Sequence, residues 1–261
     1  MLCKLLTCAI LLPAFLLSSA FVGNAQKRRL PVRAPVRKIT SQLKNLSTAK
    51  YRTPVPAIVI EEKLAILRFE PGFAAIPIQR MRAGRTLLIT GERQADGVTF
   101  FRVNLPPEKS GWVQSEAIAS NTKQGDDERL AALIRVADGF EKLELATIFL
   151  ENFPKSAFRP AILLLTGDLA EEASEKLSLS ASHKLNADEI QASGAPLHSF
   201  YLSFNELDRY RKIGVGFVFN QTVKRFHYDG AVWREILQKH SASPETVEAR
   251  KRLDSLTSQM K

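Results

Sequence analysis

Cysteine is almost missing from this chain of 261 residues, and both cysteines, Cys3 and Cys8, lie in its first eight positions. Residues 1–25 predict a secretory signal, with a basic start, an apolar run and the small-residue cleavage site Gly23-Asn24-Ala25. Cleavage before Gln26 would leave a mature chain without thiols. This excludes cysteine catalysis, thiolate metal sites and disulfides. It also predicts an extracytoplasmic protein, periplasmic or secreted.

A second interpretation of the N-terminus stays open. The basic group Lys27-Arg28-Arg29 directly follows the apolar segment, and positive charge favours the cytoplasmic side of a membrane. Leu5 to Val22 has 18 residues, close to the minimum for spanning a bilayer, although Pro13 interrupts it. An uncleaved anchor with a soluble part that faces the cytoplasm is the alternative to cleaved export.

Acidic residues are missing from positions 26–55, which form the most basic part of the chain. The segment contains nine basic residues: Lys27, Arg28, Arg29, Arg33, Arg37, Lys38, Lys44, Lys50 and Arg52. Together with Lys4 they account for the whole net charge of +10, so the rest of the chain is neutral. This argues against nucleic-acid binding, for which the charge should lie on the fold. We predict a disordered linker, either a solubilising spacer or a weak contact with an anionic surface.

Catalytic motifs are missing as well. The sequence contains no His-Glu-x-x-His motif and no Gly-x-Ser-x-Gly elbow. Gly214 and Gly216 form at most half of a dinucleotide fingerprint. The four histidines, at positions 183, 198, 227 and 240, are scattered, and we interpret them as surface or capping residues. The sequence therefore predicts no enzymatic activity, no cofactor and no metal.

Between residues 56 and 120, short β-rich runs alternate with turns. The runs are 58–60, 64–67, 86–90 and 99–105, and the turns between them contain Gly or Pro. Several short strands in close succession favour a small β-barrel. A parallel sheet would need crossover helices, for which there is no room.

The order of these signals resembles the bacterial SH3-like (SH3b) domain. The matching elements are Leu67-Arg68, Pro71, the segment from Met81 to Gly84, Phe101-Arg102-Val103 and a closing Gly111-Trp112-Val113. The Gly-Trp-Val element is the most specific of these. The resemblance covers about sixty residues, and it implies a small barrel that is linked to cell-wall binding.

Aromatic residues in this region indicate a binding surface. Phe100 and Phe101 are neighbours, so on a strand their side chains point to opposite faces. One must be core, whereas the other is either partly exposed or covered by the helical region, and such an outward aromatic marks a binding or docking surface. Phe69, Phe73 and Phe100 form the candidate binding surface. Trp112 is expected to pack across the end of the barrel as a core residue.

From residue 126 to residue 258 the pattern becomes helical. Asp126 begins an acidic first turn, which the helix dipole favours, and apolar residues follow at helical spacing. Further apolar stripes cover 143–153, 162–173, 233–237 and 247–256. Residues 121–125 are polar and have linker character, so 56–120 and 126–258 are predicted to form separate folding units.

The segment from Ala146 to Ser156, with its aromatic-Pro-x-Ser turn, resembles the turn between paired helices in tetratricopeptide-like proteins of bacterial envelopes. The segment from Trp233 to Ser243 echoes it, and both serines are expected to cap the helices that follow. This resemblance implies helical hairpins that act as a protein scaffold.

Residues 197–220 are harder to assign. Four apolar residues in this stretch fit one helical face: Tyr201, Phe204, Leu207 and Tyr210. Residues 213–219 indicate either a short strand or a buried turn. We interpret the stretch as an insertion between helical pairs.

Taken together, the sequence predicts a multi-domain chain, mainly β and then mainly α, with an SH3-like β-barrel followed by an α-helical hairpin (tetratricopeptide-like) domain. The expected function is a non-enzymatic envelope protein that binds or scaffolds, with a cell-wall polymer or an envelope protein as partner. Two alternatives remain. One is a targeting subunit or remnant of a cell-wall hydrolase, and the other is the membrane-anchored protein described above.

Overall fold

The computed structural model describes residues 53–260. The predicted signal (1–25) and nearly all of the predicted basic linker, including Lys27 to Arg52, lie outside the described residues. Within residues 53–260, no helix is both long and apolar enough to cross a membrane.

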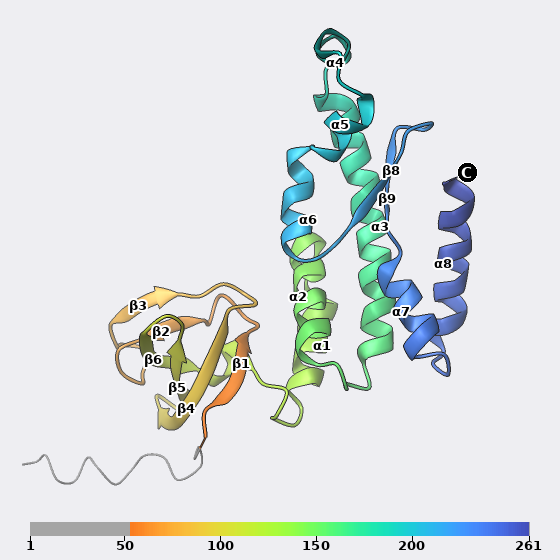
Figure 1. The fold of residues 1–261 in the computed structure, drawn as a ribbon. Helices are drawn as coiled ribbons and strands as arrows, with labels where there is room; N and C mark the ends of the chain where they lie inside the picture. The colour runs from red at the N-terminus through yellow and green to blue at the C-terminus, as the bar shows by residue number, and fades with distance from the viewer. Residues whose placement is uncertain (1–52, 261) are drawn as a thin grey trace, which may run out of the picture. The chain divides into compact units, whose positions relative to one another are not determined.

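The N-terminal part of the described chain is an antiparallel sheet of seven strands (Figure 1). The strands are β1 (Val55–Val59), β2 (Ile66–Arg68), β3 (Pro77–Arg80), β4 (Thr86–Ala95), β5 (Val98–Leu105), β6 (Lys109–Gln114) and β7 (Ile118–Ala119). A short 3-10 helix, η2 (Ser115–Ala117), connects β6 to β7. The strand order is β3-β2-β6-β5-β4-β1-β7, so β3 and β7 are the edge strands.

Alternating burial along the strands creates the core of the sheet. On β5, Phe101, Val103 and Leu105 are buried, whereas Arg102 and Asn104 are exposed. This is the period of two that a strand with one buried face requires. The inward side chains of β1, β2, β4 and β6 complete the same apolar cluster.

The C-terminal part contains eight α-helices within residues 126–259. They are α1 (Asp126–Val136), α2 (Gly139–Asn152), α3 (Arg159–Lys184), α4 (Ala187–Ser193), α5 (Leu197–Leu202), α6 (Asp208–Lys212), α7 (Ala231–Lys239) and α8 (Glu245–Gln259). A 3-10 turn, η3 (Asn205–Leu207), precedes α6, and a hairpin of β8 (Phe217–Asn220) and β9 (Arg225–Tyr228) precedes α7. The predicted layout, β first and then α, is confirmed at this level.

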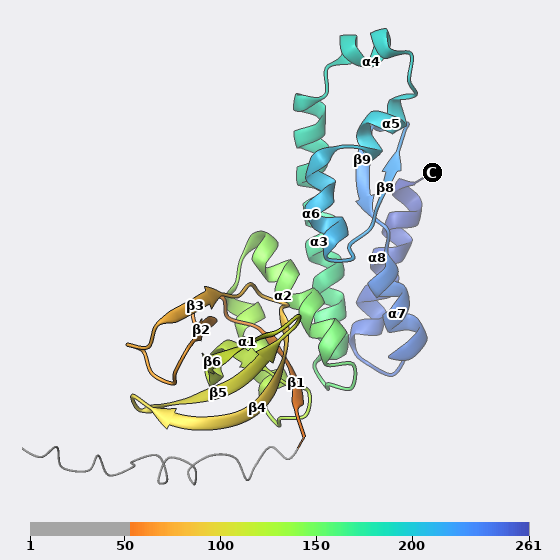
Figure 2. The same ribbon diagram turned by 60° about the vertical axis from the view of Figure 1, so that its left-hand side comes forward.

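Helix α3 is the central element of the helical part (Figure 2). With 26 residues it is about 39 Å long at 1.5 Å per residue. It packs against α2, α7, α8 and β9. Its buried positions are mainly small or aliphatic, which lets these neighbours approach closely.

The two predicted serine caps are placed differently by the structure. Ser156 lies before the start of α3, for which Phe158 is the N-cap residue. The Ser156 hydroxyl accepts from the Phe158 backbone N–H at 3.2 Å and donates to Asp127 at 2.7 Å. Ser243 likewise precedes α8, whose N-cap is Pro244. Ser156 therefore organises the turn and links it to α1.

Residues 197–220 fold onto α3. The four aromatic and aliphatic residues predicted to share one face are all buried in one cluster, although they do not lie on one helix: two short helices and a 3-10 turn carry three of them, and Phe204 lies in the connection before the 3-10 turn. Residues 217–220 form a strand, which settles the choice between strand and turn. The partner strand β9 was not expected. Side chains of α3 accept hydrogen bonds from the backbone N–H groups on the edge of β9 that faces away from β8. Phe226 N–H donates to Ser178 Oγ at 2.8 Å, and Tyr228 N–H donates to Glu171 Oε2 at 2.7 Å.

A third apolar cluster contains residues of the sheet and of α1 to α3. Ile58 of β1 and Ile60, directly after β1, pack with Leu130 and Ile134 of α1. Polar contacts reinforce this connection. The buried Asp126 carboxylate accepts from the Ser120 backbone N–H at 2.8 Å and lies 3.3 Å from the Arg129 guanidinium.

Candidate binding surfaces

The most exposed apolar side chains of the sheet surround the β2–β3 hairpin. Phe69 is 70% exposed and Ile76 is 74% exposed, and the Phe69 backbone N–H donates to the Ile76 carbonyl at 3.0 Å. Phe73 and Ile78 are 49% and 41% exposed. We call Phe69, Phe73, Ile76 and Ile78 the hairpin patch. Since β3 is an edge strand, this patch lies beside a free strand edge.

The turn that carries Phe73 is tied to the neighbouring β4–β5 turn. The Phe73 backbone N–H donates to Asp96 Oδ2 at 2.7 Å. Gly72 adopts a φ of +136°, which few other residues adopt, and a Cβ there would lie 3.3 Å from the same carboxylate oxygen. The sequence therefore folds this loop back toward the sheet.

Phe100 does not belong to the exposed surface. It points away from the sheet core, as the alternation with Phe101 predicts, yet it is 0% exposed. The Phe73 ring covers it edge-on, with 5.6 Å between the ring centroids and 69° between the planes. The prediction of Phe100 as a surface aromatic was wrong, because a loop 27 residues earlier in the chain buries it. Phe69 and Phe73 remain at the surface.

Trp112 is half-buried and lies outside the apolar clusters of the sheet, so its assignment to the core was also wrong. The strand register explains this. Trp112 pairs with Arg102 on one side and with Arg68 on the other, and directly paired residues share a face of the sheet. Because Arg102 is on the exposed face, so is Trp112. The buried neighbour of Trp112 is Val113.

Two further arginines share this outward face. Arg80 pairs with Ile66, two residues before Arg68, and Arg93 pairs with Phe100, two residues before Arg102. We call this side of the sheet the arginine face, formed by Arg68, Arg80, Arg93, Arg102 and Trp112. Within the seven strands the only acidic residue is Glu92, which pairs with Phe101 and thus belongs to the opposite face. The arginine face therefore carries positive charge without a carboxylate on the strands.

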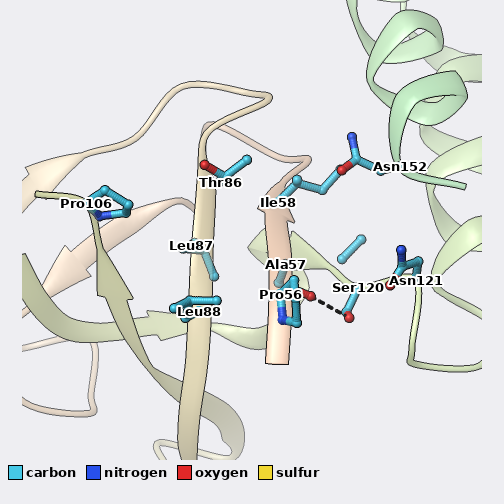
Figure 3. Close-up of a pocket in the computed structure, with 11 residues that line it drawn as sticks. Pro56, Ala57, Ile58, Thr86, Leu87, Leu88, Pro106, Ser120, Asn121 and Asn152 are labelled. Carbon is cyan, nitrogen blue, oxygen red and sulfur yellow. Dashed lines mark hydrogen bonds between the residues drawn. The ribbon is translucent and has the colours of Figure 1, made fainter. Parts of the chain in front are cut away.

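A cavity of about 270 Å³ is lined by β1, β4, the end of β7 with the residues after it, and the end of α2 (Figure 3). Its lining contains no titratable side chain. The Ser120 hydroxyl is already used, since it donates to the Pro56 carbonyl at 2.7 Å. The Asn121 amide remains, and so does the Asn152 carbonyl oxygen, since Asn152 Nδ2 already donates to the Ile148 carbonyl at 2.8 Å; this cavity therefore offers hydrogen bonding without acid–base chemistry.

A larger cavity of about 990 Å³ lies where α3 meets the β8–β9 hairpin. Glu171 and Glu175 come from α3, and Lys224 and Arg225 come from the hairpin. His227 also lines it and is 7% exposed, which differs from the predicted surface position. Its Nδ1 lies 2.9 Å from Glu171 Oε1.

The His227–Glu171 pair holds the hairpin on α3. Glu171 uses its two carboxylate oxygens for His227 Nδ1 and for the Tyr228 N–H, while His227 Nε2 is buried without a hydrogen-bond partner. No nucleophilic side chain bonds to the imidazole. Among residues 53–260, no group of three or more His, Cys, Asp or Glu side chains is placed to hold a metal ion.

The comparisons with known proteins add no relative. No protein-family model, no curated protein and no solved structure matches this chain. The surfaces described above are therefore the features of the molecule that point to its function. Of these, sequence reasoning found Phe69 and Phe73. It missed the arginine face, because only the pairing of distant strands brings its residues together.

Proposed function

We propose that this protein is a non-enzymatic binding protein of the bacterial cell envelope. In this proposal the sheet is an SH3-like barrel that binds a wall component or an envelope protein, and the helices form a tetratricopeptide-like scaffold. The observation that carries it is the hairpin patch, where Phe69 and Ile76 are about three-quarters exposed. Exposed aromatic and aliphatic anchors beside a strand edge are typical of recognition surfaces.

The chemistry of the cavities supports binding rather than catalysis. The lining of the smaller cavity has no acidic or basic side chain. In the larger cavity, Glu171 binds the His227 side chain and the Tyr228 backbone N–H, and so attaches the hairpin to α3. Catalysis through this pair would need a nucleophilic side chain within hydrogen-bond reach of the imidazole, and among residues 53–260 the imidazole is found bonded to Glu171 alone. The proposal accordingly assigns no catalytic residue.

Co-sedimentation of the full chain with purified bacterial cell-wall sacculi tests the proposal. We expect the wild-type chain to sediment with the sacculi, and Phe69→Ser/Ile76→Ser to bind about tenfold more weakly, since losing two exposed anchors removes roughly 1.4 kcal/mol. The matched control is Val136→Ser/Val247→Ser, which removes two helix residues that are 78% and 61% exposed. Equal loss in both double variants would overturn the proposal.

The same samples test the hydrolase alternative. A binding protein leaves the sacculi intact, so no soluble wall fragments should appear after long incubation. Release of fragments by the wild-type chain would replace the proposal with a wall hydrolase. Mass spectrometry of the fractionated protein tests export, with Gln26 as the expected first residue of a soluble form.

A further inference from the structure

The arginine face is a second surface, and it borders the hairpin patch, since Phe73 of that patch covers the outward Phe100. It places Trp112 between two cations, because Arg102 on β5 and Arg68 on β2 both pair directly with it. Directly paired residues have Cβ atoms about 5 Å apart, so the two arginine side chains leave the sheet on either side of the Trp112 side chain. Arg102 is exposed, and Arg68 and Trp112 are half-buried.

The two flanking cations are positioned differently. Arg68 Nη1 donates to the Ala75 carbonyl at 3.0 Å, which fixes the guanidinium over the sheet while leaving its other N–H donors for a ligand. The Arg102 side chain makes no hydrogen bond or ion pair among those found for residues 53–260. Neither arginine is neutralised by a carboxylate on the strands of this face. Asp96 and Glu70 lie in the bordering loops, and Asp96 already accepts from Phe73 N–H.

We propose that the arginine face binds an acidic polysaccharide, with Trp112 against a sugar ring and Arg68 and Arg102 on carboxylates at either side. This inference rests on the proposed binding function and names the chemistry of one ligand. Arginine forks bind carboxylates with two parallel hydrogen bonds. The C–H groups of a sugar ring carry partial positive charge and fit the negative face of the indole.

The spacing of the face matches a polymer. Strand β6 lies between β2 and β5, so the backbones that carry Arg68 and Arg102 are two strand spacings apart, about 10 Å. That is near the length of a disaccharide, so carboxylates on alternate sugars would meet the two guanidinium groups in turn. Arg80 on β3 and Arg93 on β4 extend the positive charge in both directions.

The uncharged neighbours favour a sugar over a nucleic acid. The same face carries polar side chains next to the cations: Asn104, Ser110 and Gln114. Amides and hydroxyls suit the hydroxyl groups of a glycan. Single-stranded nucleic acid is usually held by a series of aromatic side chains on which successive bases stack. Among the strand residues of this face, Trp112 is the one aromatic residue whose ring is not covered, because Phe73, from the loop between β2 and β3, covers Phe100.

Hyaluronan oligosaccharides, with one carboxylate per disaccharide, are the probe for the test. Fluorescence anisotropy of the labelled probe with the full chain should show salt-sensitive binding, and the carboxyl-reduced form of the same polymer should bind far more weakly. Arg102→Gln should weaken binding about fivefold and Arg68→Gln/Arg102→Gln more than tenfold, as expected for lost charge-assisted contacts. Circular dichroism confirms that each variant is folded.

The control variant removes the same charge elsewhere. Arg135→Gln/Arg250→Gln changes two exposed helix arginines and should alter binding less than about twofold, because screening confines electrostatic effects to about 8 Å. If both double variants bind equally, the contact belongs to the N-terminal basic segment and the proposal is overturned. Stronger binding of a twelve-nucleotide oligothymidine through the same arginines would also overturn it, in favour of nucleic acid.

Tryptophan fluorescence gives an independent readout. The chain has two tryptophans, and Trp233 is 2% exposed in the helical part. Bound oligosaccharide should therefore change the emission of Trp112 only, and Trp112→Phe should abolish the change. A change that persists in Trp112→Phe would contradict the proposal. One further result would separate this inference from the proposed function. If the chain binds sacculi through Phe69 and Ile76 but does not bind hyaluronan, the polysaccharide inference is rejected and the proposed function is not affected.

Discussion

The indole of Trp233 on α7 packs directly on the backbone of Gly167 in the middle of α3. A Cβ at position 167 would lie only 2.5 Å from Trp233 Cε2 and 2.8 Å from Cδ1. Both contacts are shorter than real Cβ atoms show, so the glycine is required for the approach of the two helices. Trp233 also meets the Tyr228 ring edge-on, with 5.3 Å between centroids.

Gly167→Ala should therefore destabilise the protein. In an exposed helix this change stabilises by up to about 1 kcal/mol, because alanine is the better helix former. Here the methyl group would push α7 away, and overpacking of this kind costs about 1–3 kcal/mol. Urea unfolding followed by Trp233 emission measures the effect. Ser182→Ala, an exposed position on the same helix, is the control and should change stability by less than about 0.5 kcal/mol.

Phe73→Ala and Phe69→Ala should differ in stability although both residues are at the surface. Phe73 covers the buried Phe100, and an edge-to-face pair contributes about 0.5–1.5 kcal/mol beyond its buried area. Phe69 makes no such ring contact among residues 53–260, so its loss should be nearly neutral. Thermal unfolding of both variants checks this. Equal melting temperatures would show that the loop does not hold Phe100 in place.

Glu235 should make the helical part sensitive to acid. Partial burial raises its pKa, but the hydrogen bond and charge of Arg159, with further charges from Lys239 and His240, outweigh this and lower the pKa below 4.5. The folded pKa is thus below the unfolded value. The stability contributed by Glu235 is present above the unfolded pKa and is lost as pH falls through the folded pKa.

Glu235→Gln tests this pH dependence. The carboxylate lies 2.7 Å from Arg159 Nη2, and both side chains are largely buried, so the variant should lose about 2 kcal/mol at pH 7. The difference from the wild type should shrink as pH falls below about 4.5 and the wild-type carboxyl is protonated. Urea midpoints from pH 7 to pH 3 provide the measurement. If the difference in stability between the wild type and Glu235→Gln stays constant over this range, the charge of Glu235 does not contribute to stability.

Ile134→Ala should affect the sheet and the helices together. Ile134 is fully buried and packs in the cluster that contains Ile58 of the sheet and Ile60 directly after β1. Replacing it should cost about 2–5 kcal/mol. We expect Trp112 emission, which reports on the sheet, and helical ellipticity to be lost in one transition. Two separate transitions would favour the division into independent folding units predicted from the linker character of residues 121–125.

Local patterns in the sequence were sufficient for several of the longer elements. The alternating runs of β4 and β5 and the apolar stripes of α1, α2 and α3 lie where they were predicted. Strand β3 escaped notice because Pro77 opens it and its exposed Ile78 breaks the alternation, as suits an edge strand. Strand β9 escaped notice because α3 side chains complete its hydrogen bonding from about 50 residues away.

The surfaces were harder to predict than the elements. The alternation of side chains along β5 correctly predicted that Phe100 points away from the core. No local feature of the sequence shows that Phe73 covers it. Trp112 was expected to pack across the end of the barrel as a core residue, although its neighbours Gly111 and Val113 are the buried ones. The arginine face depends on the registers of β2, β5 and β6, which distant contacts determine.

The attachment of β9 to α3 has a consequence for amide exchange with solvent. The Phe226 and Tyr228 amide protons are bound by side chains of another element, so separation of the hairpin from α3 releases both of them at once, even if the hairpin itself stays paired. The ladder amides of Val218 and His227 exchange only when the hairpin opens. Deuterium uptake at these two pairs of positions would separate the free energy of docking from that of hairpin formation within one molecule.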